Sequence, residues 1–390
     1  MKRNILVAHG GGPTTVINAS LFGVVDEASR YNSIGTVYGA IHGVEGVFSE
    51  EFIDLSHQDP SQLSRLPYTP ASALGSCRRK LTEEDYPRIL EVLKKYNIGC
   101  FFYNGGNDSM DTCNKISKLA KESGYDLMVV GIPKTIDNDL ALTDHCPGYG
   151  SAARFIANNT RDLWMEVQAM PMYVTILETM GRNAGWLTAA ASLPEYNGKP
   201  CTQLLYLPER VLDEDKFLAD VDNLLHKQKE ILIVVSEGLT DHTGNMIADL
   251  GIVDGFGHKL AGGAAQALCD KVTQRLGVRS RAERHGFLGR CSMIMQSAQD
   301  REEAIEVGRH AVRLAMAGRS GVMVSIKRES TVPYRYSMAE VPLEDVANLE
   351  KKVPQNWINK AGNGVTQEFI DYCRPLIGKE FPPYTILQGR

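Results

Sequence analysis

The sequence predicts an α/β fold with two Rossmann-like lobes, in which helices cover mostly parallel sheets. Three observations lead to this prediction. Short apolar runs alternate with longer segments of helical period, which is typical of buried parallel strands joined by helices. Polar or glycine-rich loops follow several of these runs. The length of 390 residues exceeds what a single hydrophobic core usually organises, so we expect two lobes.

The expected elements follow one another along the chain. Candidate buried strands are Ile5–Ala8, Cys100–Tyr103, Leu127–Ile132, Val174–Leu177, Leu204–Leu207 and Ile231–Val235. Helical patterns lie between them, as at Pro87–Lys95 and Asp111–Ser123. From about Ser330 the pattern loosens into a segment rich in proline and tyrosine, which we expect to pack back on the first lobe or to be partly flexible. The expected divisions are residues 1–145, 146–300 and 301–390.

Four polar loops each follow a candidate strand. They read HGGGPTT after the first strand, NGGNDS after Tyr103, PKTIDND after Ile132 and SEGLTD after Val235. Ligands in open α/β sheets bind at the carboxyl ends of the strands. We therefore expect these loops to converge on one crevice.

The composition indicates an ordinary globular protein: apolar residues make up 43% and charged residues 23% of the chain. A net charge of -5 gives no reason to expect nucleic acid or an anionic membrane surface as a partner. The eight cysteines stand singly, without metal-ligand spacing, and indicate reduced thiols. No apolar stretch approaches the ~20 residues of a membrane helix, and no signal peptide is evident. We expect a cytoplasmic protein.

Two glycine-rich loops are candidate phosphate cradles. In NGGNDSMDT, Gly105 and Gly106 allow a ligand to approach the backbone, and Ser109 opens a helix whose N-terminus favours an anion. The alternative is a turn in which Asp and Ser only cap the helix. The loop His9-Gly10-Gly11-Gly12 joins a strand to a helix but fits neither common nucleotide-binding fingerprint.

The stretch PKTIDND places Asp137 and Asp139 two residues apart, so both carboxylates could face the same side of an extended loop. One carboxylate could then accept the proton of an attacking hydroxyl while another holds Mg²⁺. The alternative is a turn in which Asp139 caps a helix.

These loops belong to a larger set of motifs that occur in order over most of the chain. The set is GSCRRK at Gly75–Lys80, GGNDSMDT, PKTIDND, Met180-Gly181-Arg182, SEGLTD and RAERHGFLGR. Together they resemble the phosphofructokinase family of phosphoryl transferases, and the resemblance implies a phosphofructokinase-like fold. Asp108 and Lys134 match the pyrophosphate-dependent branch, whereas ATP-dependent members typically have glycine at both positions. A carboxylate at Asp108 would repel the α-phosphate of a nucleotide.

The resemblance implies reversible transfer of a phosphoryl group from pyrophosphate to the C1 hydroxyl of fructose 6-phosphate, with Mg²⁺. Asp137 matches the catalytic base, Arg78 matches an arginine that spans the transferring group, and Lys134 would stabilise the leaving phosphate. The substrate-binding matches are Gly12 for pyrophosphate, Thr135, Asp137, Met180, Gly181, Arg182, Glu237 and Phe287 for the sugar, and Arg281 and Arg290 for its 6-phosphate. Asp108 and Asp139 are the candidate metal ligands. For the arginines, a solvated basic face is the alternative.

The chain departs from the family pattern at several positions. Asn107 stands where many relatives carry a metal-binding aspartate, which leaves Asp108, Asp137 or Asp139 as the Mg²⁺ ligand. Phe287 stands where the family usually has His or Tyr, Tyr173 replaces a basic residue, and Asn183 replaces a frequent histidine. Either fewer groups hold the sugar phosphate or the acceptor differs.

Three other functions therefore stay open. The enzyme could transfer the phosphoryl group from pyrophosphate to sedoheptulose 7-phosphate or another sugar phosphate, or it could depend on ATP. A non-catalytic sugar-phosphate sensor would need a broken site, and the intact Asp137 and Arg78 argue against it. Since the family commonly forms dimers or tetramers, the resemblance implies a homodimer or homotetramer.

Overall fold

The computed structural model describes residues 2–170, 173–253 and 259–387. The chain divides into two compact units. Within the described ranges, unit 1 contains residues 2–151, 253 and 290–351, and unit 2 contains residues 152–252, 259–289 and 352–387. The C-terminal segment that we expected at 301–390 is thus divided between the units after Lys351.

Unit 1 is built on a seven-stranded sheet with the order β15-β14-β5-β4-β1-β2-β3. Its strands are β1 (Arg3–His9), β2 (Ile34–Ala40), β3 (Phe52–Asp54), β4 (Ile98–Gly105), β5 (Met128–Pro133), β14 (Val322–Thr331) and β15 (Tyr334–Pro342). Neighbouring strands from β14 to β2 pair in parallel, while β15 and β3 are antiparallel edge strands. The carboxyl ends of β1, β4 and β5 therefore lie at the same edge of the sheet.

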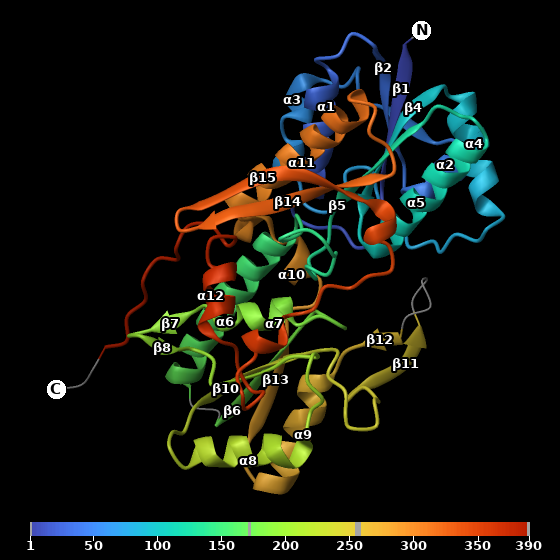
Figure 1. Ribbon diagram of the computed structural model, residues 1–390. Helices are drawn as coiled ribbons and strands as arrows, with labels where there is room; N and C mark the ends of the chain where they lie inside the picture. Colours follow the sequence, from blue (N-terminus) through green and yellow to red (C-terminus); the bar gives the residue numbers. More distant parts are fainter. Residues whose placement is uncertain (1, 171–172, 254–258, 388–390) are drawn as a thin grey trace. The chain divides into compact units, whose positions relative to one another are not determined.

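Helices cover both faces of this sheet (Figure 1). They are α1 (Ile17–Ala28), α2 (Val44–Ser49), α3 (Pro60–Leu63), α4 (Asp85–Lys95), α5 (Asn107–Glu122) and α11 (Ala298–Met316). Side chains alternate along β1: Ile5 and Val7 pack in the core that α1 and α11 share, and Leu6 and Ala8 pack in the core of α2, α4 and α5. Burial on both faces explains why the parallel strands read as continuous apolar runs.

Unit 2 contains a four-stranded parallel sheet with the order β13-β6-β10-β9. Its strands are β6 (Val174–Thr179), β9 (Leu204–Tyr206), β10 (Ile231–Ser236) and β13 (Ser280–Arg284). Two small sheets pair β7 (Glu195–Tyr196) with β8 (Lys199–Pro200) and β11 (Asp249–Val253) with β12 (Lys259–Ala261). The helices are α6 (Tyr149–Ala169), α7 (Trp186–Ala190), α8 (Glu214–Leu225), α9 (Ala264–Leu276), α10 (Leu288–Cys291) and α12 (Gln367–Cys373), of which α6 begins and α10 ends in residues of unit 1.

The α/β prediction is confirmed, and each of the six candidate strands lies on a strand of the structure. The prediction of a loosened segment from Ser330 is wrong for its first part, because β14 and β15 form an antiparallel hairpin through Thr331 and Tyr334. Among the described helices, none combines the length and apolar character needed to cross a bilayer.

Candidate active site

Three of the four predicted loops meet at the carboxyl edge of the unit 1 sheet. The backbone N–H of Gly10 donates to the carbonyl of Asn104 (2.9 Å), and the N–H of Lys134 donates to the carbonyl of Gly105 (3.1 Å). These bonds tie the loops after β1, β4 and β5 to one another. The fourth loop, SEGLTD, follows β10 in the separate sheet of unit 2. The loops that we expected to converge on one crevice therefore end two different sheets, three in unit 1 and one in unit 2.

The loop that carries Arg78 is also fixed to the loop after β1. The N–H of Gly11 donates to the carbonyl of Cys77 (3.0 Å), and the hydroxyl of Ser76 donates to the carbonyl of Gly11 (2.7 Å). Gly11 has φ +74°, a conformation that favours glycine. The backbone of Gly11 therefore fixes the position of the loop that carries Arg78.

Three cations surround Gly12. The ammonium of Lys134 donates to the Gly12 carbonyl (2.8 Å). A Cβ at Gly12 would lie 2.8 Å from Nη1 of Arg290, so this guanidinium would have to shift, and 3.5 Å from Nη2 of Arg78, which is ordinary contact. Burial, and next the charge of Arg290, lowers the pKa of Lys134 to about 8. Cations that repel one another in this way favour a multiply charged anion such as a phosphate.

The two aspartates after β5 lie in a turn. The hydroxyl of Thr135 accepts a hydrogen bond from the N–H of Asp137 (3.0 Å), and Asn138 between the aspartates has φ +55°. The side-chain oxygen of Asn138 accepts from the N–H of Cys146 (3.0 Å). The alternative in which Asp139 caps a helix is wrong, because α6 begins only at Tyr149 and no described helix starts nearer to the turn.

Lys351 braces this turn from a distant part of the chain. Its N–H donates to the carbonyl of Asp139 (2.7 Å), and its ammonium donates to the carbonyls of Thr143 (3.0 Å) and Asp144 (2.9 Å). The ammonium also lies 3.4 Å from the side-chain oxygen of Asn138. Sequence reasoning missed this residue, because nothing in a lysine more than two hundred positions away marks it as a partner of the turn.

The helix α5 begins at Asn107, so Asp108 and Ser109 lie in its first turn and Gly106 is the N-cap residue. The N-cap residue is thus a glycine that forms no side-chain cap, and Asp108 and Ser109 lie inside the helix, not at its N-cap position. The alternative in which Asp and Ser act only as caps is therefore wrong. Asp108 is exposed in this first turn, where the helix dipole favours a negative charge.

Two buried oxygens near this helix fit a hard cation. The Asn107 amide donates to Oδ2 of Asp139 (3.2 Å), whereas Oδ1 of Asn107 and Oδ1 of Asp139 accept no hydrogen bond from any described residue. No three His, Cys, Asp or Glu side chains of the described chain form a metal cluster. Mg²⁺ does not need one, since it is usually bound by one or two carboxylates together with substrate phosphates.

His9 is a further buried group that sequence reasoning did not assign. Its Nδ1 lies 2.7 Å from the hydroxyl of Ser72, and burial, together with the charge of Lys134, lowers the pKa of His9 to about 3. The imidazole is therefore neutral and adds no charge to the cations around Gly12.

The predicted sugar-binding residues Met180, Gly181, Arg182 and Glu237 lie after β6 and β10 in unit 2. The N–H of Gly181 donates to the Glu237 carboxylate (3.3 Å), and the Ser236 hydroxyl donates to the Gly181 carbonyl (2.5 Å). Burial raises the pKa of Glu237 to about 7, and the carboxylate of Glu178 acts in the same direction. Sequence reasoning also missed Glu178, which is buried and accepts from the N–H groups of Gly263 and Ala265.

The other acceptor-side predictions fall on exposed side chains or in the other unit. Arg281 lies on the edge strand β13, pairs with Glu283 and is 57% exposed. Phe287 is 68% exposed and Tyr173 is 47% exposed. Arg290 belongs to unit 1, beside Gly12, whereas Arg281 belongs to unit 2.

The fold and the site define an α/β protein of the open-sheet class with glycine-rich and cationic loops at the strand ends. Comparison with known proteins gives the particular family: residues 4–315 match the phosphofructokinase family. A Methylococcus capsulatus protein named pyrophosphate--fructose 6-phosphate 1-phosphotransferase is 41% identical over 392 residues, which cover 98% of this chain and 93% of that protein. The chain belongs to the phosphofructokinase family.

Two other relatives bear on donor and acceptor. The crystal structure of a pyrophosphate-dependent phosphofructokinase from Marinobacter aquaeolei has a TM-score of 0.88 at 39% identity and covers 98% of this chain and 94% of its own. A protein of Alkalicoccus urumqiensis named sulfofructose kinase is 34% identical over 374 residues, covering 94% of this chain and 95% of that protein. Enzymes of the phosphofructokinase family generally use a divalent metal, which agrees with the oxygens of Asn107 and Asp139.

Proposed function

We propose that this protein reversibly transfers a phosphoryl group from pyrophosphate to the C1 hydroxyl of fructose 6-phosphate, giving fructose 1,6-bisphosphate and phosphate. The observation that carries the proposal is the cationic cluster of Lys134, Arg78 and Arg290 around Gly12, with the acid Asp108 at the start of the neighbouring helix. The names of the relatives support the same donor and acceptor.

The choice of pyrophosphate over ATP is assigned to Asp108 and Lys134. The buried ammonium of Lys134 provides a fixed positive charge for the phosphate that leaves. The carboxylate of Asp108 would repel the α-phosphate of a nucleotide that extended along this loop. Pyrophosphate has no α-phosphate, so it escapes this particular repulsion.

Most residues in this mechanism position the reacting groups or neutralise their charge, because phosphoryl transfer depends mainly on these two effects. Asp137 accepts the proton of the C1 hydroxyl. The hydroxyl oxygen forms a bond to phosphorus while the bridging P–O bond of pyrophosphate breaks, and the bridging electron pair leaves with phosphate. Arg78 spans the transferring group, and Gly12 contacts pyrophosphate through its backbone.

For the metal we propose Mg²⁺, with the carboxylates of Asp139 and Asp108 and the side-chain oxygen of Asn107 as its protein ligands. When bound, such an ion neutralises part of the charge on the phosphate oxygens. The unpartnered oxygens of Asn107 and Asp139 support this set.

For the acceptor we propose that Thr135, Asp137, Met180, Gly181, Arg182, Glu237 and Phe287 bind the sugar, and that Arg281 and Arg290 bind its 6-phosphate. Unit 1 would then bind the donor and contribute Thr135, Asp137 and Arg290 to the acceptor site, and unit 2 would supply the other sugar-phosphate ligands. A homodimer or homotetramer, in which a second copy covers exposed groups such as Arg281, belongs to the same proposal, as does a cytoplasmic location. None of the eight cysteines, all of which lie within the described residues, forms a disulfide, which suits a reducing compartment.

A donor assay tests the proposal directly. Purified enzyme with Mg²⁺ and fructose 6-phosphate should form fructose 1,6-bisphosphate with pyrophosphate and much more slowly with ATP. Activity with ATP and none with pyrophosphate would contradict the proposed donor. No turnover with either donor would favour a non-catalytic sugar-phosphate sensor.

A second acceptor is worth testing because Phe287 offers no hydrogen bond to a phosphate and Tyr173 offers no positive charge. A relative named sulfofructose kinase shows that close members of the family carry names for other acceptors. We would compare kcat/KM for fructose 6-phosphate, sedoheptulose 7-phosphate and sulfofructose with pyrophosphate as donor. A clear preference for fructose 6-phosphate removes this alternative.

A further inference from the structure

A largely buried group of charged side chains holds the segment 143–148, which follows the turn of Asp137 and Asp139 in the chain. We call this group the His145 cluster; its members are Asp144 and His145 of the segment, Glu303 of α11, Arg328 of β14 and Tyr334 of β15. All five belong to unit 1. The side chains of His145 and Glu303 are each 1% exposed. The proposed mechanism assigns a task to none of the five.

Both ring nitrogens of His145 face a carboxylate. Nδ1 lies 2.8 Å from Oδ2 of Asp144, and Nε2 lies 2.6 Å from Oε2 of Glu303. An ionised carboxylate only accepts hydrogen bonds, so both ring nitrogens must carry a proton and the imidazole is a cation. Burial alone would lower the pKa of His145, but the charge of Glu303 and the hydrogen bond to Asp144 raise it to about 9.

The two carboxylates are also bound from other elements. The hydroxyl of Tyr334 donates to Oε1 of Glu303 (2.6 Å). The guanidinium of Arg328 donates to both oxygens of Asp144 through Nε (3.1 Å) and to Oδ2 through Nη2 (3.0 Å). Two cations thus balance two carboxylates, and loss of one member would leave an uncompensated charge in a buried place. The cluster therefore joins the segment 143–148 to α11, β14 and β15.

The segment that the cluster holds supports the turn of the two aspartates. The N–H of Cys146, directly after the histidine, donates to the side-chain oxygen of Asn138 (3.0 Å). The N–H of Thr135 donates to the carbonyl of Pro147 (3.3 Å), and the hydroxyl of Thr135 accepts from the N–H of Asp137 (3.0 Å). A short path of hydrogen bonds thus leads from the cluster to the proposed base.

A second carboxylate of α11 holds the far end of the same segment. Asp300 accepts from the N–H of Gly148 (2.9 Å) and from both the N–H (2.8 Å) and the hydroxyl (2.5 Å) of Ser151. Because Asp300 and Glu303 are three residues apart, they lie on the same side of the helix. One face of α11 therefore fixes the segment at both ends.

Stability alone does not explain a buried cluster of this kind. Apolar side chains of similar volume are often as stabilising as a buried ion pair. Apolar side chains, however, form no directional hydrogen bonds and do not fix a backbone segment in one place. The position of the segment, and not only the stability of unit 1, is then what the charges provide.

We propose that His145 is a positioning residue for the phosphoryl transfer: as a cation between Asp144 and Glu303 it fixes the segment that holds Asp137 in place. The inference rests on the role of Asp137 in the proposed function. It adds a residue that contacts neither substrate, and it predicts that the charge of the imidazole matters as well as its shape.

His145→Gln tests the proposal, because it removes the charge but keeps a side chain that forms hydrogen bonds. Well below Tm, kcat with pyrophosphate and fructose 6-phosphate should fall by about tenfold to a hundredfold, while both KM values change by less than about threefold. Hydrogen exchange of the amides in residues 134–140, followed by mass spectrometry, should be faster than in the wild type, because the turn loses its support.

A second substitution tests the charge itself. Glu303→Gln keeps the size of the side chain and should lower kcat in the same way. The double variant His145→Gln/Glu303→Gln loses one charge of each sign and leaves Asp144 paired with Arg328. Since residues in contact couple, its kcat should exceed that of His145→Gln by at least about twofold.

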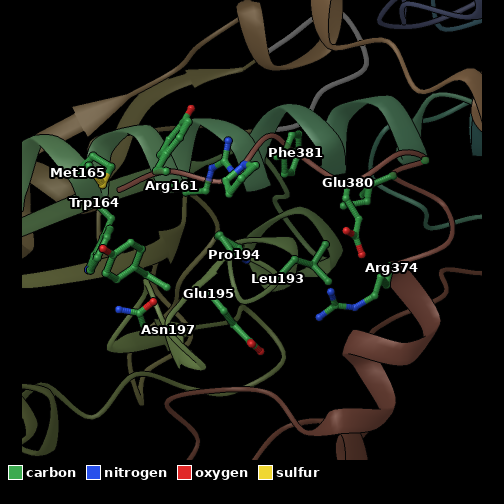
Figure 2. Close-up of a pocket in the computed structure, with 15 residues that line it drawn as sticks. Arg161, Trp164, Met165, Leu193, Pro194, Glu195, Asn197, Arg374, Glu380 and Phe381 are labelled. Carbon is green, nitrogen blue, oxygen red and sulfur yellow. The ribbon is translucent and has the colours of Figure 1, made fainter. Parts of the chain in front are cut away.

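Two controls separate positioning from stability. Figure 2 shows Arg161 of α6 beside Phe381 in a cavity of unit 2; this arginine is buried and donates to the carbonyl of Pro382 (2.8 Å). Arg161→Met should lower Tm but leave kcat and the exchange of residues 134–140 as in the wild type. His310→Gln replaces a half-buried histidine of α11 and should change neither kcat nor this exchange.

Wild-type kcat and wild-type exchange in folded His145→Gln would overturn the proposal, even with a lower Tm, because the histidine would then only stabilise the fold. If His145→Gln did not fold, the same two measurements on Glu303→Gln would decide, and unchanged values there would overturn it. Absence of turnover in the wild type with either donor would contradict the proposed function, and the exchange comparison would still show whether His145 holds the turn.

Discussion

The proposed donor groups of unit 1 and the proposed acceptor groups of unit 2 differ in how firmly the chain itself holds them. In unit 1, backbone hydrogen bonds join the loops after β1, β4 and β5, and Lys134 is buried with its ammonium on the Gly12 carbonyl. In unit 2, Glu237 is held by the N–H of Gly181, but Arg281 lies 57% exposed on an edge strand and Phe287 is 68% exposed.

The difference corresponds to two proposed tasks, binding of pyrophosphate in unit 1 and binding of the sugar phosphate in unit 2. Pyrophosphate is small and highly charged, and a preorganised group of cations stabilises charge without reorganising during the reaction. A sugar phosphate offers many hydroxyl groups, and the exposed side chains of unit 2 remain accessible for contact with it. We therefore expect substitutions in unit 1 to lower kcat and the use of pyrophosphate, and substitutions in unit 2 to raise the KM of the sugar.

The largest effect should come from Asp137→Asn, which removes the proposed base and changes almost nothing else in shape. We expect kcat to fall by about 10² to 10⁴-fold, the usual contribution of general base catalysis. Steady-state rates with pyrophosphate and fructose 6-phosphate measure this, and Tm serves as the folding control. Wild-type kcat in this variant would remove Asp137 from the mechanism.

Next in size is Lys134→Met, which tests the donor side alone. Loss of one preorganised charge at the leaving phosphate should lower kcat/KM for pyrophosphate by about 10² to 10³-fold. The KM of fructose 6-phosphate should change little. The two Michaelis constants are obtained by varying each substrate while the other is saturating.

Arg281→Met provides the matched comparison in unit 2. It should raise the KM of fructose 6-phosphate by about tenfold to a hundredfold and leave pyrophosphate kinetics nearly unchanged. If both variants affected both substrates equally, the separation of donor and acceptor tasks between the units would be lost.

The pH dependence should run in opposite directions for the two substrates. Burial lowers the pKa of Lys134 to about 8, so its charge is present below pH 8 and is lost above it. The KM of pyrophosphate should therefore rise above pH 8, by up to about tenfold per pH unit for one proton. Burial raises the pKa of Glu237 to about 7. Above pH 7 the ionised carboxylate accepts hydrogen bonds from sugar hydroxyls, and below pH 7 it is protonated and loses this ability.

The substrates also titrate, so variants supply the control. Lys134→Arg keeps its charge throughout, and Glu237→Gln has no charge to lose. The pyrophosphate inflection near pH 8 should disappear only in the first variant, and the sugar inflection near pH 7 only in the second. Inflections that persist in both variants would belong to the substrates.

The sequence was most informative where one period or one motif decides the structure. Apolar runs located the strands because parallel strands buried on both faces leave little room for polar residues. The segment around VPYRYSMAEVP was misread because its prolines were taken as signs of irregular structure. In the structure, Pro333 precedes β15 and Pro342 ends it, while Tyr336 and Met338 alternate toward the core.

The support of the site could not be predicted in the same way. The motifs pointed to Asp137 and Lys134, but the partners of these loops come from positions without any motif. Lys351 and Glu178 reach the site regions only through the fold, and a single buried lysine or glutamate has no periodic or local signal. The resemblance assigned Arg290 to the 6-phosphate together with Arg281, and its place next to Gly12 depends on how residues 290–351 return to unit 1.

Lys351→Met should give the smallest effect of these variants. It tests most clearly whether the fixed position of the unit 1 loops contributes to catalysis. The variant leaves the carbonyls of Thr143 and Asp144 without their half-buried donor, and we expect a loss of about 1 to 3 kcal/mol in the free energy of unfolding. Because the turn that holds Asp137 and Asp139 also loses its brace, kcat should fall by about tenfold or more, as small misplacements of reacting groups do.

The control for this variant is Lys118→Met, which removes a lysine from an exposed position of α5 and should change stability by less than about 0.5 kcal/mol. Rates are compared well below Tm, where both variants are fully folded. A purely structural lysine would lower Tm and leave kcat of the folded enzyme unchanged, together with its Mg²⁺ dependence. A lysine that positions the turn lowers kcat and raises the Mg²⁺ requirement at the same temperature, because Asp139 loses its fixed place.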